Sequence, residues 1–467
     1  MTDSRRPSLG PVPYIVAGCM FMENLDATVI ATALPTMARA FGTDTASLSL
    51  GISAYMVAVA IFLPLSSWLS DRFGARSVMA VSIAVFVATS MACGAANDLA
   101  TFVAMRVVQG ASAALMSPAG RLVVLRDTPK AHLVHAVAIL VWPSLIAPVL
   151  GPPLGGLITT YASWRWIFFL NLPVGLIGLA LVLRYVPTTR SQVQTPFDWT
   201  GFVMGGAALG LVIIGLEMVG TVSGRGVIGA PLLVVGLALG AITLRHLSRT
   251  AHPLVSLAPA RVPSFAISAL TGGTLTRIAV SATPFLIPIL FQTIFGYSAF
   301  EAGAMTLIYF AGNLGMKTVT TGLLRQFGFR RILLFNGAFV VLTVAALAWV
   351  SIQPPLLPVA LILLAGGATR SLQFTALNTL AFADIDKKHA GDANTLNSLV
   401  QQIAMTLGVA GAAFGLQASL SARGGSALAA IDFQVTFLGV AMCGALALIF
   451  YARLSADTGR EVSGHKT

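Results

Sequence analysis

The chain has 467 residues, of which 56% are hydrophobic and only 9% are charged. A soluble domain typically carries about 25% charged residues, so this composition excludes a water-soluble globular protein and predicts an all-α integral membrane protein. The net charge of +12 does not indicate a nucleic-acid partner, because the basic residues are scattered through short loops and form no clustered face.

Fourteen apolar segments are long enough for a transmembrane helix, which needs about 20 residues. In chain order they lie near residues 13–34, 48–69, 77–96, 100–119, 133–159, 166–186, 199–219, 226–244, 264–292, 302–322, 331–351, 355–379, 394–418 and 431–453. A count of twelve is the alternative, if 199–219 and 226–244 do not both cross the bilayer. Because both segments are long and nearly free of charge, fourteen transmembrane helices are favoured.

The basic residues are divided unevenly between alternate loops. Twenty of the 28 Lys and Arg residues fall on the side that holds both termini, and four fall on the opposite side. Cytoplasmic loops carry the excess of Lys and Arg in membrane proteins, so both termini are predicted to be cytoplasmic. The remaining four basic residues lie inside the apolar segments and are Arg106, Arg277, Lys317 and Arg370.

Two similar loops indicate an internal duplication. Residues 69–76 read LSDRFGAR and residues 323–330 read LLRQFGFR, so that Leu, Phe-Gly and the final Arg recur 254 residues apart. Each loop follows the second helix of a six-helix set, an arrangement common in secondary transporters. The predicted divisions are an N-terminal six-helix bundle at 13–186, a linker with two additional helices at 187–263, and a C-terminal six-helix bundle at 264–453. Short cytoplasmic connections are expected at 187–197 and 245–263.

The loop DRFGAR at 71–76 has a pattern suited to a tight cytoplasmic turn, in which the acidic residue caps or pairs with a neighbouring helix end and the glycine permits the turn. It resembles the gating motif of the major facilitator superfamily, which implies a latch that holds one gate closed. Ser66 and Ser70 stand where that family usually has small residues, often Gly. The gating-motif residues are Asp71, Arg72, Gly74 and Arg76.

Two further motifs lie inside predicted helices. RVVQG at 106–110 puts Arg106 near the middle of an apolar helix, where a charged residue must face the protein interior and find a partner; Glu23 and Asp26 are the candidates. APVLGPPLGG at 147–156 combines glycines that leave one helix face bare with prolines that permit a bend. The two motifs resemble the fourth-helix motif and the fifth-helix antiporter motif of the same superfamily. The antiporter-motif residues are Pro148, Gly151, Pro152, Gly155 and Gly156.

Two longer stretches narrow the resemblance. LDATVIATALP at 25–35 and WRWIFFLNLPVG at 164–175 are similar to the fourteen-helix drug–proton antiporter branch typified by EmrB and QacA. Within that branch the chain resembles the MdtD-like group. This closer resemblance rests on the segments around Arg277, Lys317 and Arg370 in the C-terminal half. The resemblance covers about residues 14–453. It implies a major facilitator fold of two six-helix halves plus two extra central helices, a bacterial inner-membrane location and proton-driven export.

Glu23 and Asp26 are three residues apart and therefore share one face of the first helix. Two carboxylates in one low-dielectric site are costly to ionise together, which suits a proton carrier, so both are proton-coupling candidates with Arg106 as their electrostatic partner. Two alternatives remain open: Asp26 as a permanent anion paired with Arg106, and Glu23 as a helix-end residue that reaches the interface. Asp26 is favoured as the carrier because the group usually has Gln where Glu23 stands. Glu217 is expected to be interfacial.

Arg277, Lys317 and Arg370 lie in predicted helices that contain no acidic residue. Unpaired cations are very unfavourable in a dry membrane interior, so these three are expected to line a wet cavity and to face an anion. That anion is either the substrate or the pair of Glu23 and Asp26 across the midplane. A purely structural role is the alternative.

The combined prediction is a proton-coupled exporter of small molecules, of multidrug type and with amphipathic or anionic substrates, that works by alternating access. A dedicated exporter of organic anions or metal chelates such as citrate is the first alternative, and a non-transporting membrane sensor is a remote one. No GxxxxGK[ST] motif occurs and the histidines lack metal-ligand spacing, so no enzyme activity, cofactor or metal is expected. Expected partners are a substrate, protons and the lipid bilayer, with the chain a monomer. Candidate substrate contacts are Gln109, Arg277, Lys317, Arg370, Gln373 and Asn378.

Overall fold

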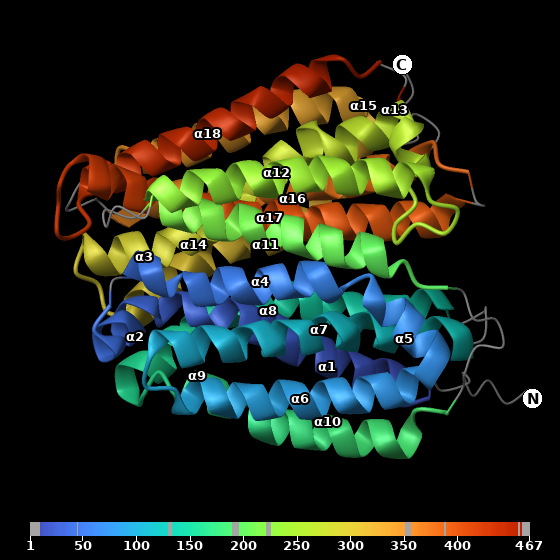
Figure 1. Ribbon diagram of the computed structural model, residues 1–467. Helices are drawn as coiled ribbons and strands as arrows, with labels where there is room; N and C mark the ends of the chain where they lie inside the picture. Colours follow the sequence, from blue (N-terminus) through green and yellow to red (C-terminus); the bar gives the residue numbers. More distant parts are fainter. Residues whose placement is uncertain are drawn as a thin grey trace, which may run out of the picture.

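The computed structural model describes residues 10–43, 45–128, 133–188, 196–220, 226–350, 356–386, 389–455 and 458–459, and within these ranges all regular structure is helical. Figure 1 shows the helices running in one general direction, with both termini at the same end of the molecule. The elements are α1 (Val12–Val29), η1 (Ile30–Thr32), α2 (Leu34–Phe41), α3 (Thr45–Leu48), α4 (Leu50–Phe62), α5 (Leu65–Phe73), α6 (Ala75–Ala95), α7 (Leu99–Asp127), α8 (Leu133–Tyr161), α9 (Trp166–Phe169), α10 (Asn171–Tyr185), α11 (Trp199–Gly220), α12 (Gly226–Arg249), η3 (Ala258–Arg261), α13 (Pro263–Phe265), η4 (Ala266–Leu270), α14 (Gly272–Thr293), α15 (Ala299–Leu347), α16 (Leu356–Ala383), α17 (Ala390–Ala422) and α18 (Ala430–Ala452).

The observed helices agree with the fourteen predicted transmembrane segments. In the described residues, eleven helices are long and apolar enough to cross a membrane, and α4 with α5, bent by 56° at Pro64, makes twelve. The 49-residue α15 consists of two helices that meet at a kink at Gly328, and α8 covers the predicted segment 133–159 with 29 residues. Large apolar side chains such as Phe335 and Phe339 are exposed on the outside, as expected where lipid replaces water. The chain is a multi-pass membrane protein.

The helices pack in two groups (Figure 1). In the N-terminal group α1 contacts α7, α8 and α10, while α7 also contacts α4 and α6. In the C-terminal group α14 contacts α15, α17 and α18, and α15 contacts α16 and α18. The groups meet through α8 with α15, α4 with α17, and η1 with α14. This packing supports the predicted division into two six-helix halves, which stays a prediction in its boundaries.

The two repeated loops have the same local geometry. Gly74 and Gly328 both have positive φ angles, 88° and 71°, which a residue without Cβ adopts freely. Two residues after each glycine an arginine binds a backbone carbonyl at the end of the last helix of its own half: Arg76 binds that of Leu183, and Arg330 binds that of Ala452 at 3.2 Å. Such carbonyls at a helix C-terminus attract cations. The two loops, 254 residues apart, are therefore alike in sequence, in backbone conformation and in the contacts of their arginines.

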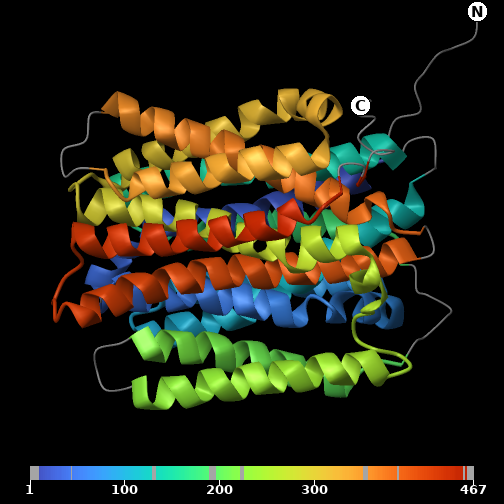
Figure 2. The same cartoon turned by 90° about the horizontal axis from the view of Figure 1, so that it is seen from above.

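The two additional helices, α11 and α12, pack against each other, and α11 contacts α4 and α17. Figure 2 shows this green pair at one edge of the molecule. The Asp198 carboxylate, just before α11, accepts hydrogen bonds from the backbone N–H groups of Gly201 at 2.8 Å and Leu254 at 3.1 Å and pairs with Nε2 of His246 at 2.9 Å. Burial alone would raise the pKa of Asp198, but these partners outweigh it and hold the pKa of this carboxyl below its usual range. The start of α11 is thereby tied to the end of α12, which continues to Arg249 and so into the predicted connection 245–263.

The glycines of the antiporter motif bring three helices close together. A Cβ on Gly151 or Gly155 would lie 2.2 Å from the hydroxyl of Thr28 or the carbonyl oxygen of Val29. On the other side of α8, a Cβ on Gly156 would lie 2.3 Å from the carbonyl oxygen of Ala299 at the start of α15. The bare surface predicted for this motif therefore contacts α1 and the C-terminal half at the end opposite the termini.

Replacing Gly156 by Ala is expected to destabilise the protein by about 1–3 kcal/mol, because the added methyl group meets the α15 backbone and not a movable side chain. The measurement is the melting temperature of the purified protein in detergent. Gly439→Ala in α18 is the matched control, since its Cβ would have no atom within 4 Å. Equal melting temperatures for the two variants would contradict the close contact between α8 and α15.

Candidate functional site

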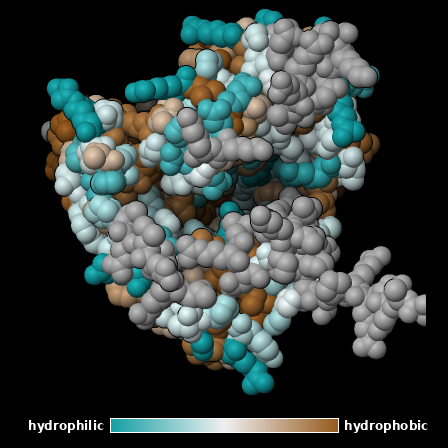
Figure 3. Space-filling view, turned by 90° about the vertical axis from the view of Figure 1, so that its right-hand side faces the viewer, coloured by the Kyte–Doolittle hydropathy of each residue, from teal (hydrophilic) through white to brown (hydrophobic). Residues whose placement is uncertain are grey.

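A cavity of about 250 Å³ lies between the two groups of helices. Its wall is built by α1, α4 and α8 on one side and by α14, α15, α16 and α17 on the other. Polar side chains in this mostly apolar wall are Glu23, Asn24, Thr28, Tyr55, Ser281, Arg370 and Gln402. Figure 3 looks at the end that holds the termini and shows a hollow near the middle of that face.

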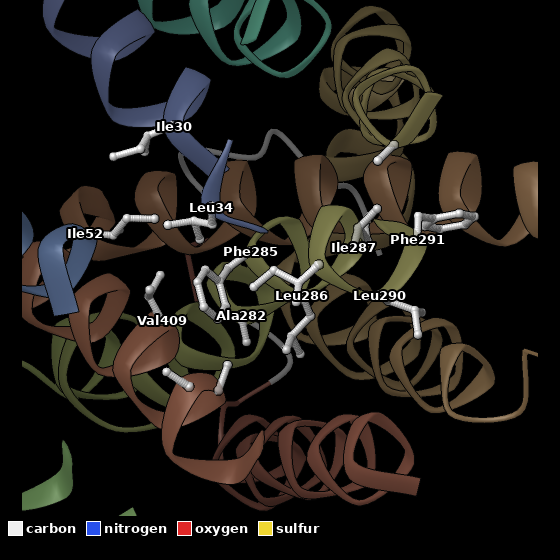
Figure 4. Close-up of a cluster of buried hydrophobic side chains, with 14 of the residues drawn as sticks. Ile30, Leu34, Ile52, Ala282, Phe285, Leu286, Ile287, Leu290, Phe291 and Val409 are labelled. Carbon is white, nitrogen blue, oxygen red and sulfur yellow. The ribbon is translucent and has the colours of Figure 1, made fainter. Parts of the chain in front are cut away.

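An apolar cluster closes the cavity at the end away from the termini. Ile52, Phe285 and Val409 line the cavity and also belong to the same buried cluster as Ile30 and Leu34. Figure 4 shows Leu34 and Ile52 from the N-terminal half beside Phe285 and Val409 from the C-terminal half. Apolar contact between the halves therefore separates the cavity from the far end.

Asp26 and Arg106 form a fully buried ion pair behind the cavity wall. Arg106 Nη1 lies 2.7 Å from Asp26 Oδ2, and both side chains are 0% exposed. The other carboxylate oxygen of Asp26 accepts hydrogen bonds from the side-chain amides of Gln109 at 3.1 Å and Asn171 at 2.7 Å. Arg106 Nη1 also donates to Gln109 Oε1 at 2.7 Å, and Asn171 donates to Ser90 at 2.9 Å. The carboxylate is thus bound by three side chains from α7 and α10.

Tyr55 stands between this network and the cavity. Its ring lies under the guanidinium of Arg106, 4.1 Å from the ring centroid to Cζ, a distance typical of a cation–π contact. Tyr55 itself lines the cavity, and its hydroxyl is buried without a hydrogen-bond partner among the described residues. A ligand in the cavity can therefore reach Tyr55 but not Asp26.

Glu23 occupies a different environment from Asp26, although only three residues separate them. It lines the cavity, and one of its carboxylate oxygens accepts a hydrogen bond from the hydroxyl of Ser117 on α7. Asp26 does not line the cavity. One face of α1 thus presents a cavity-exposed carboxylate one turn from a carboxylate that is fully committed to its partners.

Arg370 faces Glu23 across the same cavity. Arg370 lines the cavity, its Nη1 atom is buried without a hydrogen-bond partner in the described residues, and its guanidinium lies 5.5 Å from the ring centroid of Phe310. Lys317 follows Phe310 by seven residues, on the same helix face and nearer the end with the termini, where its Nζ donates to Thr375 Oγ1 at 2.9 Å. Arg370 therefore lines the cavity, and Lys317 lies nearer than the cavity to the end of the molecule that holds the termini.

The third predicted cation, Arg277, is fully buried and does not line the cavity. It donates to the backbone oxygens of Ser268 at 3.1 Å and Ala269 at 3.3 Å, and to Oδ1 of Asn378 at 3.0 Å and Asn397 at 3.2 Å. The two backbone oxygens belong to η4, a π-helix that ends at Leu270 and is followed by Thr271, where φ and ψ are −109° and −92°. Arg277 is therefore bound by four neutral oxygens, two of them from this irregular backbone, where sequence reasoning expected an anion; its Nε has no hydrogen-bond partner among the described residues.

The remaining predicted substrate contacts also lie away from the cavity. Gln373 is fully buried, accepts from Asn336 at 2.8 Å and donates to the Leu333 carbonyl at 3.2 Å, which ties α16 to the second part of α15. Asn378 is the acceptor for Arg277, and Gln109 belongs to the Asp26 network. In the gating motif, Arg72 lies over the Trp68 ring. Glu217 lies in α11, but its side chain falls outside the described part of the chain.

A model of the Major Facilitator Superfamily matches residues 16–409. The chain belongs to the major facilitator superfamily. It is 33% identical over 476 residues to the putative multidrug resistance protein MdtD of Escherichia coli O6:H1, and the alignment covers 99% of this chain and 98% of the relative. The MdtD of Salmonella paratyphi A is 33% identical over 458 residues, 95% of each chain. The crystal structure of a D-xylose–proton symporter has a TM-score of 0.69 at 16% identity, covering 96% of this chain and 98% of that one.

Membership in the superfamily agrees with the fold predicted from the motifs, but several functional neighbours of the site escaped sequence reasoning. Ser117 in α7, Ser281 in α14 and Asn171 at the start of α10 are each flanked by apolar residues. That isolation is the signal that would have found them, because a polar side chain in a membrane helix needs a partner. Their partners in the described structure are Glu23 for Ser117 and Asp26 for Asn171.

The two carboxylates of α1 are expected to respond differently to neutralisation. Asp26→Asn leaves Arg106 as an uncompensated buried charge, and breaking a buried pair in this way costs about 3–5 kcal/mol. Glu23→Gln keeps a side-chain acceptor for Ser117 and is expected to cost much less. Thermal melting of the purified variants in detergent measures both. A Glu23→Gln variant as unstable as Asp26→Asn would contradict the assignment of Asp26 as the structural anion.

Proposed function

We propose that this chain is a proton-coupled secondary transporter that exports small molecules by alternating access. The observation that carries the proposal is the cavity between the halves, in which Glu23 of α1 and Arg370 of α16 line opposite walls. An acid–base group at a site that also binds substrate is what coupling requires, because the two binding events then influence each other. The relatives named as putative multidrug resistance proteins support efflux of multidrug type.

Glu23 is the proposed proton-exchanging group. It is the carboxylate in the cavity wall, whereas Asp26 is held by Arg106, Gln109 and Asn171. In the state open toward the termini, substrate entry displaces the proton from Glu23 toward the cytoplasm. After the halves reorient, Glu23 takes up a proton from outside and the substrate leaves. Arg106 acts through Asp26 and Tyr55 as a positioning residue in this scheme.

A second candidate is a dedicated exporter of organic anions or metal chelates. It is favoured by three donors of cavity-lining residues that have no hydrogen-bond partner in the described part of the chain: Tyr55 Oη, Ser281 Oγ and Arg370 Nη1. The two candidates differ in the group that holds the substrate. A cationic substrate competes with the proton for ionised Glu23, whereas an anionic substrate is held by Arg370 on the opposite wall.

The membrane topology belongs to the same proposal. The excess of Lys and Arg on the side of the termini supports a cytoplasmic location for both ends, and the bacterial relatives support the inner membrane. Both halves that form the cavity come from one chain, which supports a monomer. The predicted division at 13–186, 187–263 and 264–453 gives each half the helices that build its wall.

Glu23→Gln is expected to abolish proton-coupled transport, because it removes the ionisable carboxylate from the cavity wall. The assay uses inside-out membrane vesicles with a respiration-driven pH gradient, which a transported compound partly collapses; tetraphenylphosphonium and citrate are the two probes. Glu301→Gln is the control, since Glu301 caps α15 through Ser298 and glutamine also serves in a capping box. A pH response to either probe that persists in Glu23→Gln would contradict the role of Glu23.

Arg370→Gln and Lys317→Gln separate the two candidate substrate classes. If anions are the substrates, these variants lose the citrate response, and the wild-type response to tetraphenylphosphonium is weak. A strong response to the cation alone, unchanged in both variants, would exclude the anion exporter.

A further inference from the structure

A second, polar pocket of about 600 Å³ lies at the end of the molecule opposite the termini. Its walls come from both halves: α2, α3 and the end of α8 on one side, and the end of α14 with the start of α15 on the other. In Figure 1, α2 and α3 lie at the end away from the N and C labels. This outer pocket is separate from the central cavity, with which it shares no lining residue.

The chemistry of the outer pocket suits an anion. Among the described residues of its lining, Arg39 carries the one charge, and it is accompanied by hydroxyl groups of Thr36, Thr159, Thr160 and Thr293. The Arg39 guanidinium makes two long contacts within its own helix, Nε to the Pro35 carbonyl and Nη2 to Thr36 Oγ1, both at 3.3 Å. The nearby Glu301 carboxylate is committed to the backbone N–H and hydroxyl of Ser298. The planar guanidinium fork matches oxyanions, and the hydroxyls supply further donors.

One of these hydroxyls lacks a partner. Thr159 Oγ1 is buried and has no hydrogen-bond partner among the described residues. Leaving such a group unsatisfied is unfavourable, and because Thr159 lines the pocket, rotation of its side chain would let a bound acceptor remove this defect. Thr159 lies next to Thr160, whose hydroxyl accepts from the backbone N–H of Phe300 at 3.2 Å.

The outer pocket exists only while the halves touch at this end. Two of its lining residues carry hydrogen bonds from one half to the other: Thr160 with Phe300, and Gln292, whose Nε2 donates to the Thr32 carbonyl at 2.9 Å. Separation of the halves at this end would divide the pocket between them. A ligand that binds one of two states shifts the equilibrium toward that state.

We infer that the outer pocket binds a small dissolved oxyanion through Arg39 and the threonine hydroxyls, and that its occupation stabilises the conformation closed at this end. The second half of the inference rests on the proposed alternating access. External oxyanion at high concentration then slows the opening of the outer end and acts as a brake on the transport cycle from the outside.

Equilibrium dialysis of the purified full-length protein against radiolabelled sulfate tests the site without any transport. Wild-type protein is expected to bind sulfate saturably, Arg39→Gln to weaken binding about tenfold or more, and Thr159→Val to weaken it less. Arg165→Gln is the matched control, because Arg165 binds Asn97 and lies over Trp164, away from the pocket. Absence of saturable binding, an adventitious ion only, or binding that survives Arg39→Gln overturns the site.

The conformational half is tested by cysteine labelling from outside. In a variant without Cys19, Cys93 and Cys443, Ile30→Cys puts a thiol in the buried cluster that closes the outer end. External sulfate is expected to slow its reaction with a membrane-impermeant maleimide about threefold or more, and not to slow it when Arg39 is also replaced by Gln. Sulfate binding without slower labelling overturns the brake. A thiol that never reacts contradicts alternating access itself, while the dialysis still decides the site.

Discussion

The structure depends on the burial of two opposite charges, Asp26 and Arg106, inside the N-terminal half. Transfer of either ion alone from water into this interior would be highly unfavourable, and their attraction offsets that only with good geometry and further hydrogen bonds. The pair is 2.7 Å apart, and the amides of Gln109 and Asn171 satisfy the second carboxylate oxygen, while Arg106 Nη2 has no hydrogen-bond partner among the described residues. Because the partners lie on α1, α7 and α10, the network fixes α1, which lines the cavity, against the two helices behind it.

In the C-terminal half, a buried arginine also holds helices together, but without a carboxylate partner. Arg277 is also fully buried, but four neutral oxygens surround it, two of them from the irregular backbone of η4. Each half thus contains one arginine that is committed to its interior. Charged groups that are not committed in this way, Glu23 and Arg370, line the cavity between the halves. Asp26, Arg106 and Arg277 therefore have structural roles, whereas Glu23 and Arg370 are available to protons and ligands.

Much of the architecture followed from the sequence, because hydrophobic length alone decides where a chain can cross a bilayer. The paired loops at 69–76 and 323–330 also predicted a repeat whose glycine angles and arginine contacts recur in the structure. The sequence named Asp26 and Glu23 as the two candidate partners for Arg106. It does not show that Asp26 is buried against Arg106 while Glu23 lines the cavity. Arg277 and Gln373 could not be assigned from sequence, since their partners are backbone oxygens and amides from other helices.

Infrared difference spectroscopy of the purified protein on acidification tests the division between Glu23 and Asp26 most directly, because a carboxyl group shielded from water gives a separate C=O stretching band when it becomes protonated. The account predicts that such a band appears in the wild-type protein and in Glu301→Gln, and that it is lost in Glu23→Gln. A band that persists unchanged in Glu23→Gln would show that another carboxyl takes up the proton and would contradict the account.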